Sequence, residues 1–123
     1  MRWRLLSANN RDLGRGGAGY QTAEECLQAI DTLLGRLHEC EAAIRPGPQN
    51  RWLWSLRLAG TVLAVSGHGF DRQIRCMRAQ AQFVSYAPAA VVDAPIKYTG
   101  ARRTRGSFSH LQTPRSAVFQ PEL

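Results

Sequence analysis

The glycine run Gly14-Arg15-Gly16-Gly17-Ala18-Gly19 has the spacing of a dinucleotide-binding loop. In such a loop the glycines let a pyrophosphate approach backbone N–H groups at the start of a helix. The motif requires a buried parallel strand before it, and a second strand ending in an acidic residue after the helix. The sequence pattern supplies neither. We therefore expect a glycine-rich turn and no bound cofactor.

Ser66, His68 and Asp71 lie close together and have the residue types of a nucleophile, a base and an orienting acid. Neighbouring residues of one loop seldom reach the geometry that a catalytic triad needs. Asp71 also suits the N-cap position of a following helix. The sequence thus predicts a protein that is not an enzyme, with a small enzyme that uses the Ser66 and His68 loop as the least favoured alternative.

Metal-ligating residues are few. His38 and Cys40 are two positions apart and would point to different faces of a helix, whereas zinc sites use three or four protein ligands. The three cysteines are odd in number and form no CxxC pair, which argues against a disulfide framework or a zinc ribbon. We expect no metal and reduced, half-buried thiols.

Positive charge is the chemistry that the sequence favours most, because the formal net charge is +7. Residues 1–45 have six Arg against six acidic residues, and residues 46–93 have five Arg against two Asp. Residues 94–123 have Lys97 and four Arg against Glu122. Charge growing toward one end indicates a polyanionic partner, either nucleic acid or an acidic protein. Arginine supplies 15 of the 16 basic residues, so genome composition is an alternative explanation.

The basic residues concentrate on a predicted helix, one strand and the C-terminal segment. The predicted polyanion-binding residues are Arg57, Arg72, Arg75, Arg78, Arg102, Arg103 and Arg105. Trp52 and Trp54 offer stacking surfaces for bases. The alternative is a solvated basic face with the tryptophans in the core, since strand alternation buries one or both of them. Binding through these residues would be nonspecific in sequence and sensitive to salt.

The length of 123 residues and the apolar content of 44% fit one small globular domain. No apolar run reaches the roughly 18 residues that cross a bilayer, and the start of the chain lacks the apolar stretch of a secretory signal. We expect a soluble cytoplasmic protein without membrane contact.

An internal repeat organises these elements. A shift of 50 positions superposes several glycines, aromatic residues and cysteines without gaps. The coinciding pairs are Leu6 and Leu56, Leu13 and Leu63, Gly17 and Gly67, Gly19 and Gly69, Tyr20 and Phe70, Cys26 and Cys76, and Ala29 and Ala79. The glycine run and the Ser66 loop are not kept in the other copy. We therefore predict a duplicated α+β unit, with copies at 1–45 and 46–93.

Each copy predicts two strands and a helix. In copy two, strands over 52–58 and 61–65 flank an Ala59-Gly60 turn; in copy one, an Asn9-Asn10 turn joins strands over 3–7 and 11–15. The first helix starts at a Thr22 capping box and has an apolar stripe through Leu33 and Leu37. The second starts near Asp71, ends before Pro88, and would bury Ile74, Cys76, Met77, Phe83 and Val84. Short extended pieces follow at 43–44 and 90–92, and residues 94–123 form a basic, largely disordered tail.

The repeated pattern resembles the YegP-like family of small uncharacterised proteins. The matching residues are Trp3, Leu5, Ala8, Asn9, Gly19, Tyr20 and Thr22 in copy one, and Trp54, Leu56, Gly60, Ser66 and Phe70 in copy two. The resemblance implies a tandem β(3)-α-β unit within one domain over 1–93. It also implies one antiparallel sheet in which the units exchange their last strands, with both helices on one face. It brings no established activity and no catalytic residues.

Taken together, the sequence predicts a non-enzymatic binding module with weak affinity for nucleic acid or another polyanion through copy two and the tail. The alternative is a structural module that pairs with other proteins through its sheet edges. The duplication is compatible with a monomer containing an internal pseudo-dimer and with a homodimer.

Overall fold

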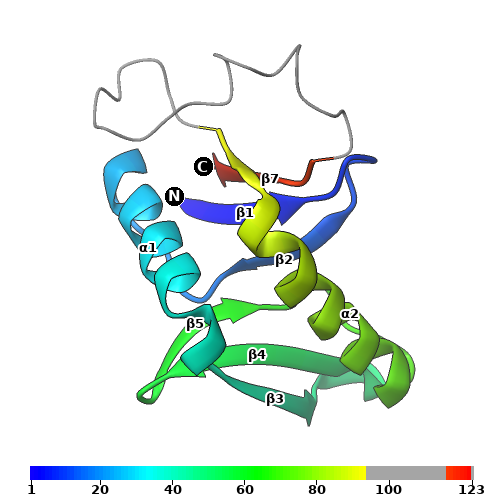
Figure 1. Ribbon diagram of the computed structural model, residues 1–123. Helices are drawn as coiled ribbons and strands as arrows, with labels where there is room; N and C mark the ends of the chain where they lie inside the picture. Colours follow the sequence, from blue (N-terminus) through cyan, green and yellow to red (C-terminus); the bar gives the residue numbers. More distant parts are fainter. Residues whose placement is uncertain (94–115, 123) are drawn as a thin grey trace.

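The computed structural model describes residues 1–93 and 116–122, which form one mixed seven-stranded sheet and two α-helices (Figure 1). The elements are β1 (Arg2–Leu6), β2 (Asp12–Gly16), α1 (Ala23–Gly35), β3 (Glu41–Pro46), β4 (Trp52–Leu58), β5 (Thr61–Val65), α2 (Gln73–Tyr86), β6 (Val91–Val92) and β7 (Val118–Glu122). Short 3-10 helices η1 (Leu37–Glu39), η2 (Pro48–Asn50) and η3 (Ala87–Ala89) lie between them. The strand order is β3-β4-β5-β2-β1-β7-β6, so the predicted α+β class is confirmed.

Both predicted hairpins are present. β1 pairs with β2 and β4 pairs with β5, each antiparallel and each with a register shift, between Leu5 and Leu6 in the first pair and between Leu56 and Arg57 in the second. Asn10 has φ 63°, and Ala59 and Gly60 have φ 50° and 86°. Two successive residues with positive φ make the two-residue turn that matches the twist of a hairpin, and Gly60 adopts that conformation without steric cost.

The first half of the glycine run, through Gly16, belongs to β2, so the prediction of a glycine-rich turn is wrong for this half; residues 17–18 form a bend after the strand. A Cβ on Gly14 would lie 2.7 Å from the ring of Phe83 and 2.9 Å from Trp54, and one on Gly16 would lie 2.7 Å from Trp3. The glycines are therefore the space into which aromatic rings pack. Their spacing reflects the period of a strand, in which alternate residues face the core.

Helix α1 starts as predicted. Thr22 Oγ1 accepts the Glu25 N–H at 3.1 Å, and Glu25 Oε1 accepts the Thr22 N–H at 3.2 Å, which completes the capping box. Its buried residues recur every three or four positions: Cys26, Leu27, Ile30 and Leu33. This face packs against the sheet.

Helix α2 departs from its prediction in two ways. Arg72, and not Asp71, occupies the N-cap position and makes no side-chain cap, while Asp71 lies 3.8 Å from Arg75. The predicted apolar stripe is also partly wrong. Cys76 and Phe83 are buried as expected, together with Gln80, but the remaining predicted members are exposed: Ile74 at 50%, Met77 at 48% and Val84 at 38%. The buried stripe of α2 consists of Cys76, Gln80 and Phe83, which are three or four positions apart. The three exposed apolar residues lie beside this stripe on the helix surface.

Both helices cover one face of the sheet, where a single core forms (Figure 1). Helix α1 contacts β1, β5 and β7, whereas α2 contacts β4, β2 and β3. The ring of Phe83 lies between Trp3 and Trp54, with centroid separations of 6.2 Å and 5.0 Å. The core residues are Trp3, Leu5, Leu27, Ile30, Leu33, Trp54, Leu56, Ala64, Cys76, Phe83, Ala87, Val92, Ala117 and Phe119.

The sequence predicted an antiparallel sheet. This prediction is wrong for one strand pair, because β6 runs parallel to β7. β7 comes from the segment that the sequence assigned to a tail, and it lies between β1 and β6. Ala117 is 6% exposed and Phe119 is fully buried, so this strand contributes to the core. The rest of the predicted tail, residues 94–115 and 123, lies outside the described residues.

The strand pairings repeat across the sheet. β3 pairs antiparallel with β4, opposite Leu56 and Trp54, while β7 pairs antiparallel with β1, opposite Leu5 and Trp3. β3, which follows α1, thus pairs with β4, the first strand after residue 46. On the other side, β7 occupies the position next to β1, and β6, which follows α2, lies outside it. Neither described helix has the length and apolar character needed to cross a membrane.

Candidate functional site

The sheet face opposite the helices carries arginine side chains from several strands. Strand alternation places Trp54 and Leu56 of β4 in the core, so Leu53, Ser55 and Arg57 point to the other side. In the described part of the chain, no helix packs on this second face. We refer to it as the open face.

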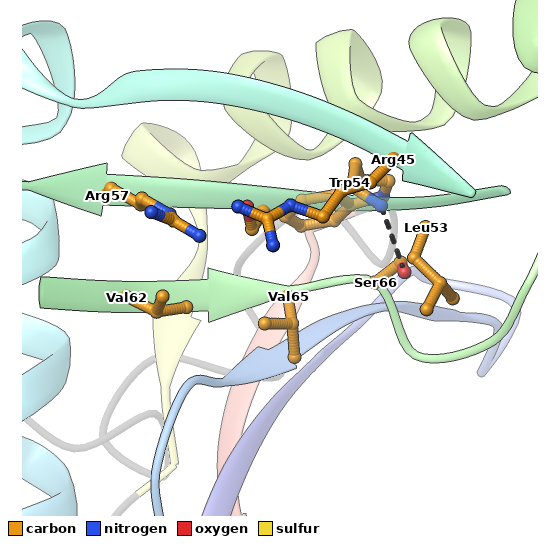
Figure 2. A pocket seen from close by; sticks show the side chains of 8 residues that line it. Arg45, Leu53, Trp54, Arg57, Val62, Val65 and Ser66 are labelled. Atoms are coloured by element: carbon orange, nitrogen blue, oxygen red, sulfur yellow. Dashed lines mark hydrogen bonds between the residues drawn. The ribbon is translucent and has the colours of Figure 1, made fainter. Parts of the chain in front are cut away.

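A cavity of about 320 Å³ lies on the open face over β3, β4 and β5 (Figure 2). Its lining residues are Arg45, Leu53, Trp54, Ser55, Arg57, Val62, Val65 and Ser66. The pairing register explains this grouping: Arg45 lies opposite Leu53, Ser55 opposite Val65, and Arg57 opposite Val62. The site therefore combines apolar side chains from β4 and β5 with two guanidinium groups.

Figure 2 shows the guanidinium groups of Arg45 and Arg57 reaching toward one another across β4. Two polar atoms in this region, Arg57 Nε and Ser55 Oγ, are covered and hydrogen-bond to no described residue. Ser66 Oγ accepts the backbone N–H of Trp54 at 3.3 Å. Two guanidinium groups that reach toward one another, next to a hydroxyl without a described partner, offer hydrogen-bond donors that suit an anion with several acceptor oxygens.

The other half of the open face differs, because its arginines are paired. Arg4 Nε lies 2.9 Å from Glu122 Oε2, and Arg15 Nε donates to Asp12 Oδ2 at 3.1 Å. Arg2 Nε donates to the carbonyl of Gly16 at 2.8 Å.

By contrast, Arg45 and Arg57 form no ion pair with any residue in 1–93 or 116–122. Glu41 is nevertheless the cross-strand partner of Arg57 on this face, so the β3–β4 side carries two guanidinium groups and one carboxylate.

The structure separates the arginines that the sequence grouped together. Arg57 lies on the open face, whereas Arg72, Arg75 and Arg78 are exposed on α2, which packs on the opposite face of the sheet. Arg75 is 3.8 Å from Asp71. Arg102, Arg103 and Arg105 lie outside the described residues. Arg57 and the α2 arginines therefore belong to different surfaces.

The tryptophans do not offer the predicted stacking surfaces equally. Trp54 is 1% exposed and packs on Phe83, so its ring is not available for a base. Trp52 is half-buried and pairs through its backbone with Phe70. For Trp54, the alternative that strand alternation buries it in the core is confirmed.

The structure does not bring together the side chains of Ser66, His68 and Asp71. Ser66 lines the open-face cavity, while His68 lines a second cavity of about 380 Å³ beside Asp12, Phe70 and Gln82. The imidazole of His68 lies 4.6 Å from the ring of Phe70. The three side chains are thus not arranged as a nucleophile, a base and its orienting acid.

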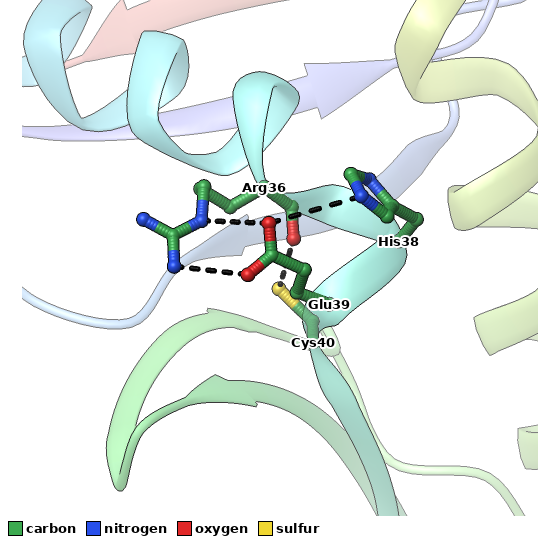
Figure 3. Close-up of polar contacts among 4 residues, drawn as sticks. All are labelled: Arg36, His38, Glu39 and Cys40. Atoms are coloured by element: carbon green, nitrogen blue, oxygen red, sulfur yellow. Dashed lines mark hydrogen bonds and ion pairs between the residues drawn. The ribbon is translucent and has the colours of Figure 1, made fainter.

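His38 and Cys40 lie in and just after η1, where local contacts hold them (Figure 3). Glu39 accepts two hydrogen bonds from Arg36, both at 2.9 Å, and lies 3.7 Å from His38 Nε2. The Cys40 thiol donates to the Arg36 carbonyl at 3.5 Å. The hydrogen bonds from Arg36 lower the pKa of the Glu39 carboxyl. In the described part of the chain, no group of three or more His, Cys, Asp or Glu could hold a metal ion.

The cysteines are free thiols. Cys26 and Cys76, which coincide in the sequence repeat, are both fully buried in the core. Burial raises the pKa of each thiol and also that of Cys40. A raised pKa disfavours the thiolate, which is the reactive form, so none of the three has the environment of a nucleophilic cysteine.

Sequence reasoning missed Arg45, Ser55 and Ser66 as members of the candidate site. Ser55 could have been found from the sequence, because strand alternation places it on the same face as Arg57, two positions away. The approach of Arg45 depends on β3 pairing with β4 in the register that the structure shows, and no local pattern specifies that register.

Comparison with known proteins adds no assignment. No protein-family model, no curated protein and no solved structure matches this chain.

Proposed function

We propose that this protein is a non-enzymatic binding module for polyanions, and that Arg45 and Arg57 form the centre of its site. The observation that supports this proposal most is the contrast within one sheet face. Arg2 donates to a carbonyl, and Arg4 and Arg15 form ion pairs with Glu122 and Asp12, whereas Arg45 and Arg57 form no ion pair with a described residue. Two adjacent guanidinium groups repel one another unless an anion lies between them.

The chemistry of the cavity favours phosphate groups. Each guanidinium presents several N–H donors in a planar fork that matches phosphate oxygens, and Ser55 adds a hydroxyl. No exposed aromatic ring lines the cavity, since Trp54 is buried. Contacts would therefore be made to a nucleic-acid backbone and not to its bases, which gives binding that is nonspecific in sequence.

The arginines of α2 and of residues 94–115 have a secondary part in this proposal. Arg72, Arg75 and Arg78 lie on the helical side of the sheet, so they cannot contact the same short ligand as Arg57. Arg102, Arg103 and Arg105 remain predicted contributors to binding through long-range attraction.

We also propose that the fold arose by duplication of a YegP-like unit. The matching burial of Cys26 and Cys76, and the matching roles of Trp3 and Trp54, support this origin. The contacts of the helices also support this origin. Helix α1 contacts β1 and β7, and α2 contacts the corresponding strands β4 and β3.

Titration of labelled single- and double-stranded RNA and DNA, followed by fluorescence anisotropy, tests the anion site. The double variant Arg45→Gln/Arg57→Gln should weaken binding about tenfold or more. Losing two phosphate contacts should also reduce the slope of log affinity against log salt by about 1.4 to 1.8. The single variant Arg57→Gln should show about half of each effect.

The matched control is Arg75→Gln/Arg78→Gln, which removes the same charge from α2. Its affinity should stay within about threefold of the wild type, because the lost charges act only at long range. Equal losses in the two double variants would show that net charge alone matters and would contradict the assigned site. Absence of binding at low salt would end the polyanion proposal.

A further inference from the structure

Strand β3 forms one edge of the sheet and, among the described residues, pairs only with β4. The backbone groups of Trp52 and Trp54 bond to Phe70 and Ser66, on the side away from β3. Hydrogen-bonded and non-hydrogen-bonded pairs alternate along an antiparallel ladder. Their β3 partners, Pro46 and Ile44, therefore direct their backbone groups away from β4.

Two residues further along, Ala42 has the same outward direction as Ile44. The edge thus presents the N–H and C=O groups of Ala42 and Ile44, together with the carbonyl of Pro46. Pro46 has no N–H, which ends the usable edge at that residue. The opposite edge of the sheet, β6, has only two residues and offers no comparable length.

The side chains of β3 are self-complementary. Glu41, Ala43 and Arg45 alternate onto the open face, where Glu41 lies opposite Arg57 of β4 without forming an ion pair with it. A second β3 placed antiparallel about Ala43 sets each Glu41 opposite the Arg45 of the other copy, so that Glu41 lies between an arginine of each chain. The same register sets Ala42 opposite Ile44, which joins the outward backbone groups of both copies in four hydrogen bonds. Backbone and side-chain complementarity thus select one register.

The two neighbouring registers with matching backbone directions lose the charge pairing. Centring the pair on Ile44 sets Arg45 opposite Ala43. Centring it on Ala42 sets Glu41 opposite Ala43 and Arg45 opposite position 39, where Glu39 lies in η1 outside β3 and is bonded to Arg36. Opposite charges directly across an antiparallel pair are favourable, whereas like charges are unfavourable. Only the Ala43-centred register pairs both charges in both copies.

We infer that two copies of this chain associate through β3 in the Ala43-centred register. The two sheets become one continuous sheet, and the two open faces lie side by side across the two-fold axis. Small side chains at Ala42 and Ala43 allow the strands to approach without steric conflict. This inference does not rest on the proposed anion site, because it requires no ligand.

Sedimentation velocity of the full chain over a range of concentrations tests the inference, with a dimer as the expected result. Arg45→Glu places like charges opposite one another twice in the interface. Glu41→Arg does the same, and it also sets a second arginine opposite Arg57 within each chain. Each should raise the dimer dissociation constant at least about tenfold. The exchanged double variant, Glu41→Arg/Arg45→Glu, restores opposite charges and should return the constant to within about threefold of the wild type.

Cross-linking checks the register independently. Paired residues that are not hydrogen-bonded lie with their Cα atoms about 4.5 Å apart, within the range of a disulfide. In a Cys40→Ser background, Ala43→Cys should oxidise to a covalent dimer, whereas Ala42→Cys, which faces Ile44, should not. The circular dichroism spectrum and melting transition of each variant establish that it is folded.

Three results would overturn the inference. A monomer at every concentration would exclude the association. A dimer whose affinity ignores the charge reversals would place the contact elsewhere. A dimer in which folded Ala43→Cys fails to cross-link would exclude this register.

Discussion

The ring of Phe119 meets the indole of Trp3 edge to face, with 5.3 Å between their centroids. This contact joins a strand from the last residues of the chain to the first strand, and both side chains are buried. β7 therefore contributes to the core as well as pairing with β1. It contacts α1, just as β3 contacts α2.

Replacing Phe119 with alanine should lower the free energy of unfolding by about 3 to 5 kcal/mol, the usual cost of removing a large buried aromatic ring. The lost ring leaves a cavity against Trp3 that the sheet cannot close fully. Urea denaturation followed by tryptophan fluorescence measures the change. Gln120→Ala is the control, because the Gln120 side chain is only partly buried and donates one hydrogen bond, at 3.4 Å to Asp93, among the described residues, so its loss should cost much less. Equal effects of the two substitutions would mean that β7 is not part of the core.

Gly14→Ala should destabilise the protein by about 1 to 3 kcal/mol, because the new methyl group overpacks the core. It would lie within 2.7 Å of Phe83 and 2.9 Å of Trp54, two rings already in contact. Thermal unfolding followed by near-ultraviolet circular dichroism reports both the stability and the aromatic packing.

The matched substitution is Gly35→Ala at the end of α1, where an added Cβ has no neighbour within 4 Å. It should be neutral or stabilise by up to about 1 kcal/mol, because alanine reduces the conformational freedom of the unfolded chain. A harmless Gly14→Ala would contradict the close approach of the two rings to β2.

Thiol reagents should modify the cysteines in a fixed order at mildly alkaline pH. Cys26 and Cys76 are fully buried, whereas Cys40 is partly exposed, so Cys40 should react first. Because burial raises the pKa of all three thiols, each native rate should be below that of the same thiol in urea. Mass spectrometry after timed alkylation gives the order. Rapid native modification of Cys76 would show that α2 opens readily.

The Arg36–Glu39 pair should give a small pH dependence of stability. Its hydrogen bonds lower the pKa of Glu39 in the folded state, so the folded protein holds this proton less tightly than the unfolded chain. The resulting stabilisation is present above the unfolded pKa of Glu39 and is lost as the pH falls through the folded pKa.

Comparing unfolding of the wild type with Glu39→Gln at neutral and acidic pH tests this linkage. The wild type should be slightly more stable at neutral pH, and the difference should vanish in acid. Both side chains are exposed, so the effect should be small. A difference that grows in acid would contradict the sign.

Local patterns in the sequence determined much of this protein. Several features depend only on residues that are near one another in the chain. They are the Thr22 capping box, the positive-φ turns at Asn10 and Ala59-Gly60, and the strand alternation around Trp54. Such features follow from backbone geometry and hydrogen bonding over a few residues. They predicted both hairpins, both helices and the α+β class.

Only the tertiary structure decided the rest. The buried side of α2 follows Cys76, Gln80 and Phe83, because the helix orients to place the Phe83 ring between Trp3 and Trp54. The five residues of β7 resemble no strand by periodicity, and they pair with β1 only because that edge lies beside a core that Phe119 fills. The nearness of Arg45 to Arg57 likewise depends on long-range register. Pairing between distant segments is set by the burial that the whole sheet achieves, and a local pattern does not contain that information.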